Sequence, residues 1–132
     1  MVSALLGGEP LRTATWWTRP QIPTTAGGTP GCWESSLGTP GPVEIATSGR
    51  VLGQEILFLG SASTKGNHAK IGVSTGAHPY SIFGDMNQQG SLNGPNCGSS
   101  QNGRGGLFYV VESVPLAAAV RDLISGGTAP AN

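Results

Sequence analysis

Charged side chains are scarce in this sequence. Only 11% of its 132 residues are Asp, Glu, Lys or Arg, and the seven basic residues are balanced by seven acidic ones. Soluble domains usually carry about 25% charged residues. A neutral chain lacks the broad basic field of typical nucleic-acid-binding proteins. Any recognition of phosphate must therefore be local and come from a few well-placed side chains.

Long hydrophobic runs are also missing. No run of about 18 apolar residues occurs, so the sequence predicts no transmembrane helix and no membrane partner. The opening residues, MVSALLGG, are too short for a signal peptide and lack its basic region. This absence does not decide the compartment, because the chain can be a fragment or a mature form.

Cysteine is rare as well. The two cysteines, Cys32 and Cys97, lie far apart and form no C-x-x-C pair. We therefore expect no metal site from them. A single disulfide between Cys32 and Cys97 and a pair of free thiols are both compatible with the sequence.

Glycine and proline, in contrast, are abundant, with 22 and 10 copies. They recur too often in residues 1–42 for a helix or a central strand, so we interpret this segment as irregular. Within it, Thr13–Thr18 is a candidate short strand. The three tryptophans, Trp16, Trp17 and Trp33, also lie here. They either pack this segment onto a sheet or stack on nucleic-acid bases, and the sequence does not separate the two interpretations.

Residues 43–126 have the pattern of an α/β (α+β) fold, and residues 127–132 form a tail that we expect to be frayed. Val51–Leu59 ends in a continuous apolar run, as for a strand buried on both faces. Leu107–Val111 predicts a further strand. Ser113 is a candidate N-cap for a closing helix. Its apolar stripe consists of Leu116, Ala119, Val120, Leu123 and Ile124.

His68 and Lys70 stand two positions apart at the start of a strand-like run that leads into a predicted hairpin. Side chains alternate across a strand. Ile71 and Val73 therefore suit a core, whereas His68, Lys70 and Ser74 share the opposite face. On this interpretation, the side chains of the histidine and the lysine point to the same side of the strand.

A His-x-Lys pair on one strand face suits phosphodiester cleavage. An imidazole can attack phosphorus and form a phosphohistidine, which divides one difficult displacement into two easier ones. An ammonium group stabilises the charge that develops on the non-bridging oxygens. An amide such as that of Asn87 can donate a hydrogen bond to phosphate or orient the imidazole. A surface lysine beside a structural histidine would give the same short pattern.

The motifs around this pair occur in a specific order. Asn67-His68-Ala69-Lys70 is followed by Gly84-Asp85-Met86-Asn87, then by a polar loop and Gly103-Arg104-Gly105-Gly106. This order resembles the C-terminal half of the deoxyribonuclease II family, within the phospholipase D superfamily. The resemblance implies a phospholipase D-like mixed β-sheet with few flanking helices. It also implies a metal-independent acid endonuclease that uses no cofactor and cleaves DNA, while a preference for RNA stays open.

The resemblance also assigns roles by position. His68 and Lys70 match the catalytic pair, and Asn87 matches the asparagine that closes the second motif. Ser74 and Arg104 are further candidates for contacts with phosphate. An acid optimum is implied, because one histidine must stay protonated while the other is neutral. By resemblance, the compartment would be secreted or lysosome-like and acidic.

This chain departs from the family in carrying one His-x-Lys where relatives carry two. The only other histidine, His78, lies at the far end of the hairpin strand, roughly 20–30 Å from His68 at 3.3 Å per residue. We do not expect it to be the partner. Glu112 is a candidate to support His68 in the folded sheet. Activity therefore needs a second His-x-Lys, from a homodimer mate or from a missing N-terminal half. The alternative is a non-catalytic fragment, or a structural or binding module that retains the motif.

Overall fold

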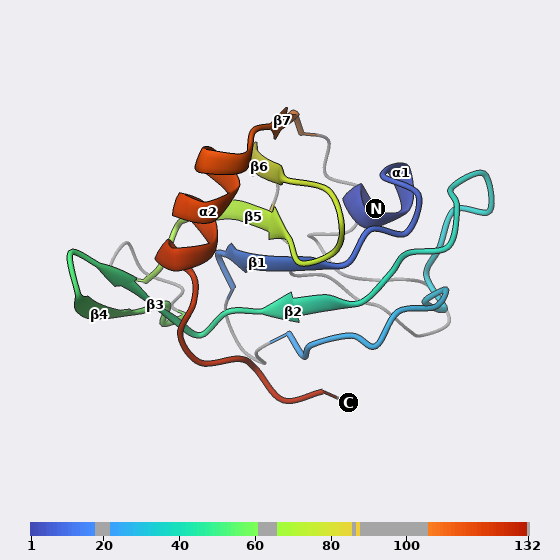
Figure 1. Cartoon of the computed structure of the whole chain (residues 1–132). Coiled ribbons are helices and arrows are strands. Elements are labelled where there is room, and N and C mark those ends of the chain that lie inside the picture. The colour runs from blue at the N-terminus through green and yellow to red at the C-terminus, as the bar shows by residue number, and fades with distance from the viewer. Residues whose placement is uncertain (18–21, 61–65, 86, 88–105, 132) are drawn as a thin grey trace.

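The computed structural model of the chain describes residues 1–17, 22–60, 66–85, 87 and 106–131. Five strands form one mixed sheet in the order β2-β1-β5-β6-β7, and two further strands form a separate hairpin (Figure 1). The predicted α+β class is confirmed. The elements are α1 (Val2–Leu5), β1 (Leu11–Thr15), β2 (Val43–Ile45), β3 (Ser48–Val51), β4 (Gln54–Leu57), β5 (Lys70–Ser74), β6 (Tyr80–Gly84), β7 (Phe108–Glu112) and α2 (Val114–Leu123).

The N-terminal segment supplies a central strand of the sheet. β1 pairs in parallel with β2 and antiparallel with β5. The interpretation of residues 1–42 as irregular is therefore wrong at this point, although a short strand was expected nearby. Pro10 precedes β1 and so leaves the N–H groups of the strand intact. Leu11 and Ala14 are buried on opposite faces of the sheet, so β1 is covered on both sides.

α2 covers one face of the sheet and closes the main core (Figure 1). The predicted helix is confirmed. Its predicted apolar stripe is wrong at one position, because Ala119 is exposed and Ala117 is buried instead. Val73 on β5 faces this helix, as its alternation predicted. The buried residues of this core are Ala14, Ala46, Phe58, Val73, Ala117, Val120 and Ile124.

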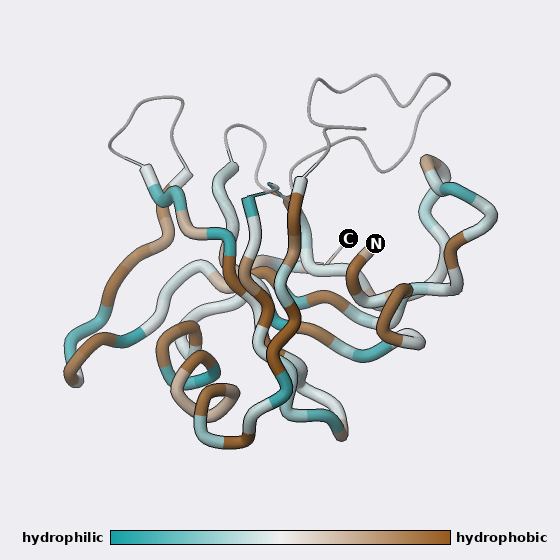
Figure 2. The backbone as a smooth tube through the Cα atoms, turned by 90° about the horizontal axis from the view of Figure 1, so that it is seen from above, coloured by the Kyte–Doolittle hydropathy of each residue, from teal (hydrophilic) through white to brown (hydrophobic). Residues whose placement is uncertain are grey.

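The run Val51–Leu59 forms no strand buried on both faces. The chain reverses at Leu52 and Gly53, which have φ angles of 50° and 79°. β3 and β4 therefore pair as an antiparallel hairpin that projects from the sheet, with hydrophobic stretches along its length (Figure 2). Leu57 is 60% exposed, whereas Phe58 is buried in the core and Ile56 packs against it. The prediction of a buried strand was wrong because it rested on apolar content alone. The turn takes the chain away from the core.

The C-terminal residues are held against the sheet. The N–H of Ala129 donates to the carbonyl of Ile45 at 2.8 Å. The N–H of Thr24 donates to the carbonyl of Pro130 at 3.0 Å. Ala129 is buried. The expectation of a frayed tail is wrong because these bonds cover the outer side of β2. The opposite edge strand of the sheet is β7.

Candidate functional site

The predicted catalytic pair lies at the start of β5. β5 begins at Lys70, so His68 precedes the strand rather than standing on it. Asn67 shapes this entry, since its Oδ1 accepts from the N–H of Ala69 at 2.9 Å and its Nδ2 donates to the carbonyl of Thr15 at 3.1 Å. The predicted alternation is thus confirmed from Lys70 onward and is wrong for His68.

Lys70 and His68 are nevertheless in direct contact. The Lys70 Nζ donates to the His68 carbonyl oxygen at 3.0 Å. The imidazole is exposed, and its centroid lies 6.5 Å from the ring of Trp16. An exposed imidazole can be reached by a large substrate. The lysine therefore contacts the backbone of the histidine, and its charge lies close to that residue.

Neighbouring Trp17 packs against the chain that leaves the β3–β4 hairpin. Its Nε1 donates to the carbonyl of Phe58 at 3.3 Å. At Gly60 an added Cβ would collide with the indole ring, so the ring lies flat against the backbone there. For Trp17 the packing interpretation is therefore confirmed. The contact also holds the end of β1 beside the segment that approaches His68.

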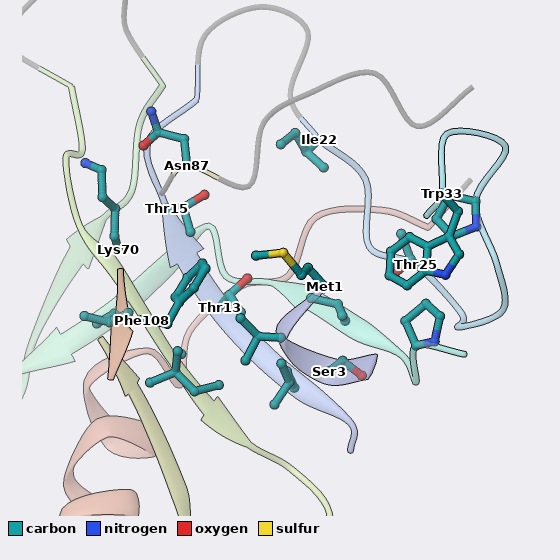
Figure 3. A pocket seen from close by; sticks show the side chains of 18 of the residues that line it. Met1, Ser3, Thr13, Thr15, Ile22, Thr25, Trp33, Lys70, Asn87 and Phe108 are labelled. Carbon is teal, nitrogen blue, oxygen red and sulfur yellow. The ribbon is translucent and has the colours of Figure 1, made fainter. Parts of the chain in front are cut away.

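Asn87 and Lys70 are seventeen positions apart in the sequence. Both line one end of a cavity of about 250 Å³ (Figure 3). The chain leading to Asn87 is tied to β7, because the N–H of Leu107 donates to the Asp85 Oδ1 at 2.9 Å. The Asn87 Oδ1 is buried and has no hydrogen-bond partner among the described residues. This side chain therefore has an unused acceptor beside the cation.

The cavity lies on the face of the sheet opposite α2. Its floor carries small side chains on neighbouring strands, since Thr13 pairs with Gly72 and Thr15 with Lys70. Its other walls come from α1 and from the chain between Ile22 and Val43. Sequence reasoning missed this cavity because its walls come from separated segments. One pattern in the sequence could have indicated it. Small residues, Thr13 and Thr15 on β1 and Gly72 on β5, occupy the strand face that points away from the core.

Ser74 is not available to a phosphate. Its side chain is fully buried, and its Oγ donates to the Glu9 Oε1. The same Oγ accepts from the N–H of Gly76 at 3.1 Å. The expected phosphate contact from Ser74 is therefore not supported, because the alternation that aligned it with Lys70 also carries it under the N-terminal segment. Glu9 also accepts from the N–H of His78 at 3.3 Å.

His78 and Glu112 lie at the end of the sheet away from His68. His78 follows β5 and stacks on Tyr80, with ring centroids 5.0 Å apart and an interplanar angle of 10°. Glu112 is the register partner of Tyr80, whereas Gly84 and Phe108 pair at the Lys70 end. The suggestion that Glu112 supports His68 is therefore wrong, because antiparallel pairing places it at the opposite end.

Three further predicted residues are Cys32, Cys97 and Arg104. Cys32 is disulfide-bonded, so the alternative of a free thiol is wrong for this residue. Cys97 and Arg104 lie outside the described residues. Met86 of the Gly-Asp-Met-Asn motif also lies outside them.

Comparisons with protein-family models, curated proteins and solved structures found no match to this chain. In the part of the chain that the structure describes, no helix has both the length and the apolar character to cross a membrane. Those residues also contain no group of three or more His, Cys, Asp or Glu side chains suited to holding a metal ion. A function for this chain is therefore proposed from its own residues.

Proposed function

We propose that this chain is a deoxyribonuclease II-like half domain of phospholipase D type, which cleaves phosphodiester bonds of DNA without a metal ion. The observation that carries the proposal is the meeting of Lys70 and Asn87 at one end of a cavity, with the exposed His68 in contact with Lys70. These are the residues that the order of motifs singled out. Their juxtaposition supports a shared role at phosphate.

In the proposed reaction the neutral imidazole of His68 attacks phosphorus, and the bond from phosphorus to the leaving oxygen breaks. The leaving oxygen takes a proton from a second, protonated imidazole. Water then gives a proton to the second imidazole, now neutral, and attacks the phosphorus of the phosphohistidine; the P–N bond breaks, which releases the phosphate end and restores both imidazoles. The ammonium of Lys70 stabilises charge on the non-bridging oxygens, and the Asn87 amide donates a hydrogen bond to one of them.

The proton donor must come from outside the site described above. His78 belongs to the opposite end of β5, against Tyr80. A second His-x-Lys therefore comes from a homodimer mate, as in single-motif members of the superfamily, or from an N-terminal half. Because one imidazole is neutral while the other is protonated, the rate should fall on both sides of an acid optimum.

Plasmid nicking in the presence of a chelator at about pH 5 tests the proposal. We expect His68→Ala and Lys70→Gln to abolish nicking and His78→Ala, the matched control, to retain it. Light scattering on the same samples measures the oligomeric state. If a dimer completes the site, the rate should rise more steeply than linearly with chain concentration. Nicking by His68→Ala at the unaltered rate would overturn the proposal.

The alternative function is a non-catalytic binding module that retains the motif. The walls of the cavity favour it, because they are mainly apolar and include Phe108 and Ile82. A site that only cleaves a phosphate backbone has no need of such walls. Absence of nicking combined with a strictly monomeric chain would select this alternative.

A further inference from the structure

The cavity is elongated and has different chemistry at its ends and in its middle. Lys70 and Asn87 lie at one end, Trp33 and Thr25 at the other, and Phe108 and Thr13 between them (Figure 3). Small-molecule sites are typically apolar clefts of about 300–1,000 Å³ with a few placed polar groups. At about 250 Å³ this cavity suits a slender ligand.

Two buried polar atoms of the lining lack a partner within the described residues. They are the Asn87 Oδ1 at one end and the Trp33 Nε1 at the other. Buried polar atoms in folded proteins are hydrogen-bonded in about 90% of cases or more. A third such atom, the Ser81 Oγ, belongs to no residue of the cavity wall. The Asn87 Oδ1 can accept a hydrogen bond from a ligand O–H, and the Trp33 Nε1 can donate one to a ligand oxygen.

The charge at the cavity is positive. Lys70 contributes the sole charged side chain among the described residues that line it, and none of them is acidic. Its ammonium has three donors, and within the described part of the chain it forms one hydrogen bond, to the His68 carbonyl. A cation at one end of a mainly apolar cavity recognises an anion that carries an apolar chain.

We propose that the cavity binds an unbranched aliphatic anion, whose carboxylate or phosphate head accepts from the Lys70 ammonium and whose chain is directed past Phe108 toward Trp33; a monoprotonated phosphate head would also donate to the Asn87 Oδ1. At about 30 Å³ per group, 250 Å³ holds about eight groups of methylene size. The chain should therefore be about eight carbons long. An oxygen at its far end would accept from the Trp33 Nε1. Binding requires no cleavage and no second chain.

Calorimetric titration of the whole chain with octanoate, octyl phosphate and octanol tests the proposal. We expect one or both anions to bind at least about tenfold more tightly than octanol, since a charge-assisted hydrogen bond adds about that factor. The stronger anion identifies the head group. From butanoate to octanoate, each methylene should tighten binding about three- to fourfold, and longer chains should gain nothing. An ω-hydroxyl on octanoate should tighten binding further.

Variants separate the head from the chain. Lys70→Gln should weaken both anions about tenfold and leave octanol unchanged, whereas Arg50→Gln, an exposed charge on β3, should change neither. Thr13→Phe should block all three ligands, with its fold checked by circular dichroism. If that variant does not fold, Gly72→Ala constricts the same floor, because its methyl would lie 3.1 Å from the Thr13 Cγ2.

Three results would overturn the proposal. They are no binding of any ligand, an affinity that does not depend on chain length, and an equal loss for octanol and the anions in Lys70→Gln. His68 does not line the cavity, so His68→Ala should bind the anions normally. If the chain binds these anions but does not nick DNA, the proposed nuclease function is refuted and the proposed anion binding stands. If the chain nicks DNA but binds no aliphatic anion, the proposed anion binding is refuted and the nuclease function stands.

Discussion

The side chain of Arg12 joins the centre of the sheet to the chain that follows α2. Arg12 is 7% exposed. Its guanidinium donates five hydrogen bonds, to the carbonyls of Ile124, Gly126 and Gly127, to the Thr128 Oγ1 and to the Glu44 Oε2. The bond from Nε to Ile124 is 2.6 Å long and fully buried. Replacing Arg12 with Met keeps most of the aliphatic length and removes every donor.

The expected loss follows from the exposure of each acceptor. A hydrogen bond to a charged group contributes about 1.5–3 kcal/mol, and a buried group left unpaired costs about 1–3 kcal/mol. Glu44 has a side chain that is 46% exposed, so its ion pair adds less than about 1 kcal/mol. Water can replace part of the bonding at the half-buried carbonyls. We therefore expect Arg12→Met to lower the free energy of unfolding by about 3–5 kcal/mol.

Urea and thermal unfolding, followed by circular dichroism, measure this loss. The thermal midpoint should fall by about 10–20 °C. Arg50→Met is the matched control, because Arg50 is exposed on the hairpin and its loss should change stability by less than about 0.5 kcal/mol. Glu44→Gln should cost less than about 1 kcal/mol. A loss below about 1 kcal/mol for Arg12→Met would refute the assignment of Arg12 as the anchor of this segment.

Three further substitutions test the packing by urea unfolding. Leu52→Asn should stabilise the chain by about 0.5–1 kcal/mol, because Leu52 is 98% exposed at a φ of 50° and Asn-Gly suits this turn; a lower midpoint would contradict this. Gly49→Ala places a methyl against the Leu123 carbonyl and should cost at least about 1–3 kcal/mol, so a wild-type midpoint would be inconsistent. Ile124→Ala empties a fully buried site and should cost about 2–5 kcal/mol.

Local patterns predicted the C-terminal half of the sheet well. The alternation of Lys70, Ile71 and Val73 identified the two faces of β5, and α2 starts where Ser113 indicated. These features depend on neighbours within a few residues, which a sequence displays directly. The position of His68 was missed because Asn67 turns the backbone just before the strand.

Features that depend on distant contacts were not predictable. β1 was judged too close to prolines and glycines to be central, yet its neighbours β2 and β5 lie about 30 and 60 residues further along the chain. The cavity could not be predicted because Trp33 and Asn87 meet it from opposite ends and share no local pattern. Ser74 shares a face with Lys70, but only the folded chain reveals that Glu9 covers it.

The most direct measurement of the nuclease proposal is the covalent intermediate itself. DNA incubated with the chain in chelator and quenched in strong base should yield a protein–DNA adduct on a denaturing gel, with the phosphate mapped to His68 by mass spectrometry. The adduct should form with the wild-type chain and with His78→Ala and be absent from His68→Ala. Nicking without any adduct, or an adduct that persists in His68→Ala, would contradict the proposal that His68 is the nucleophile.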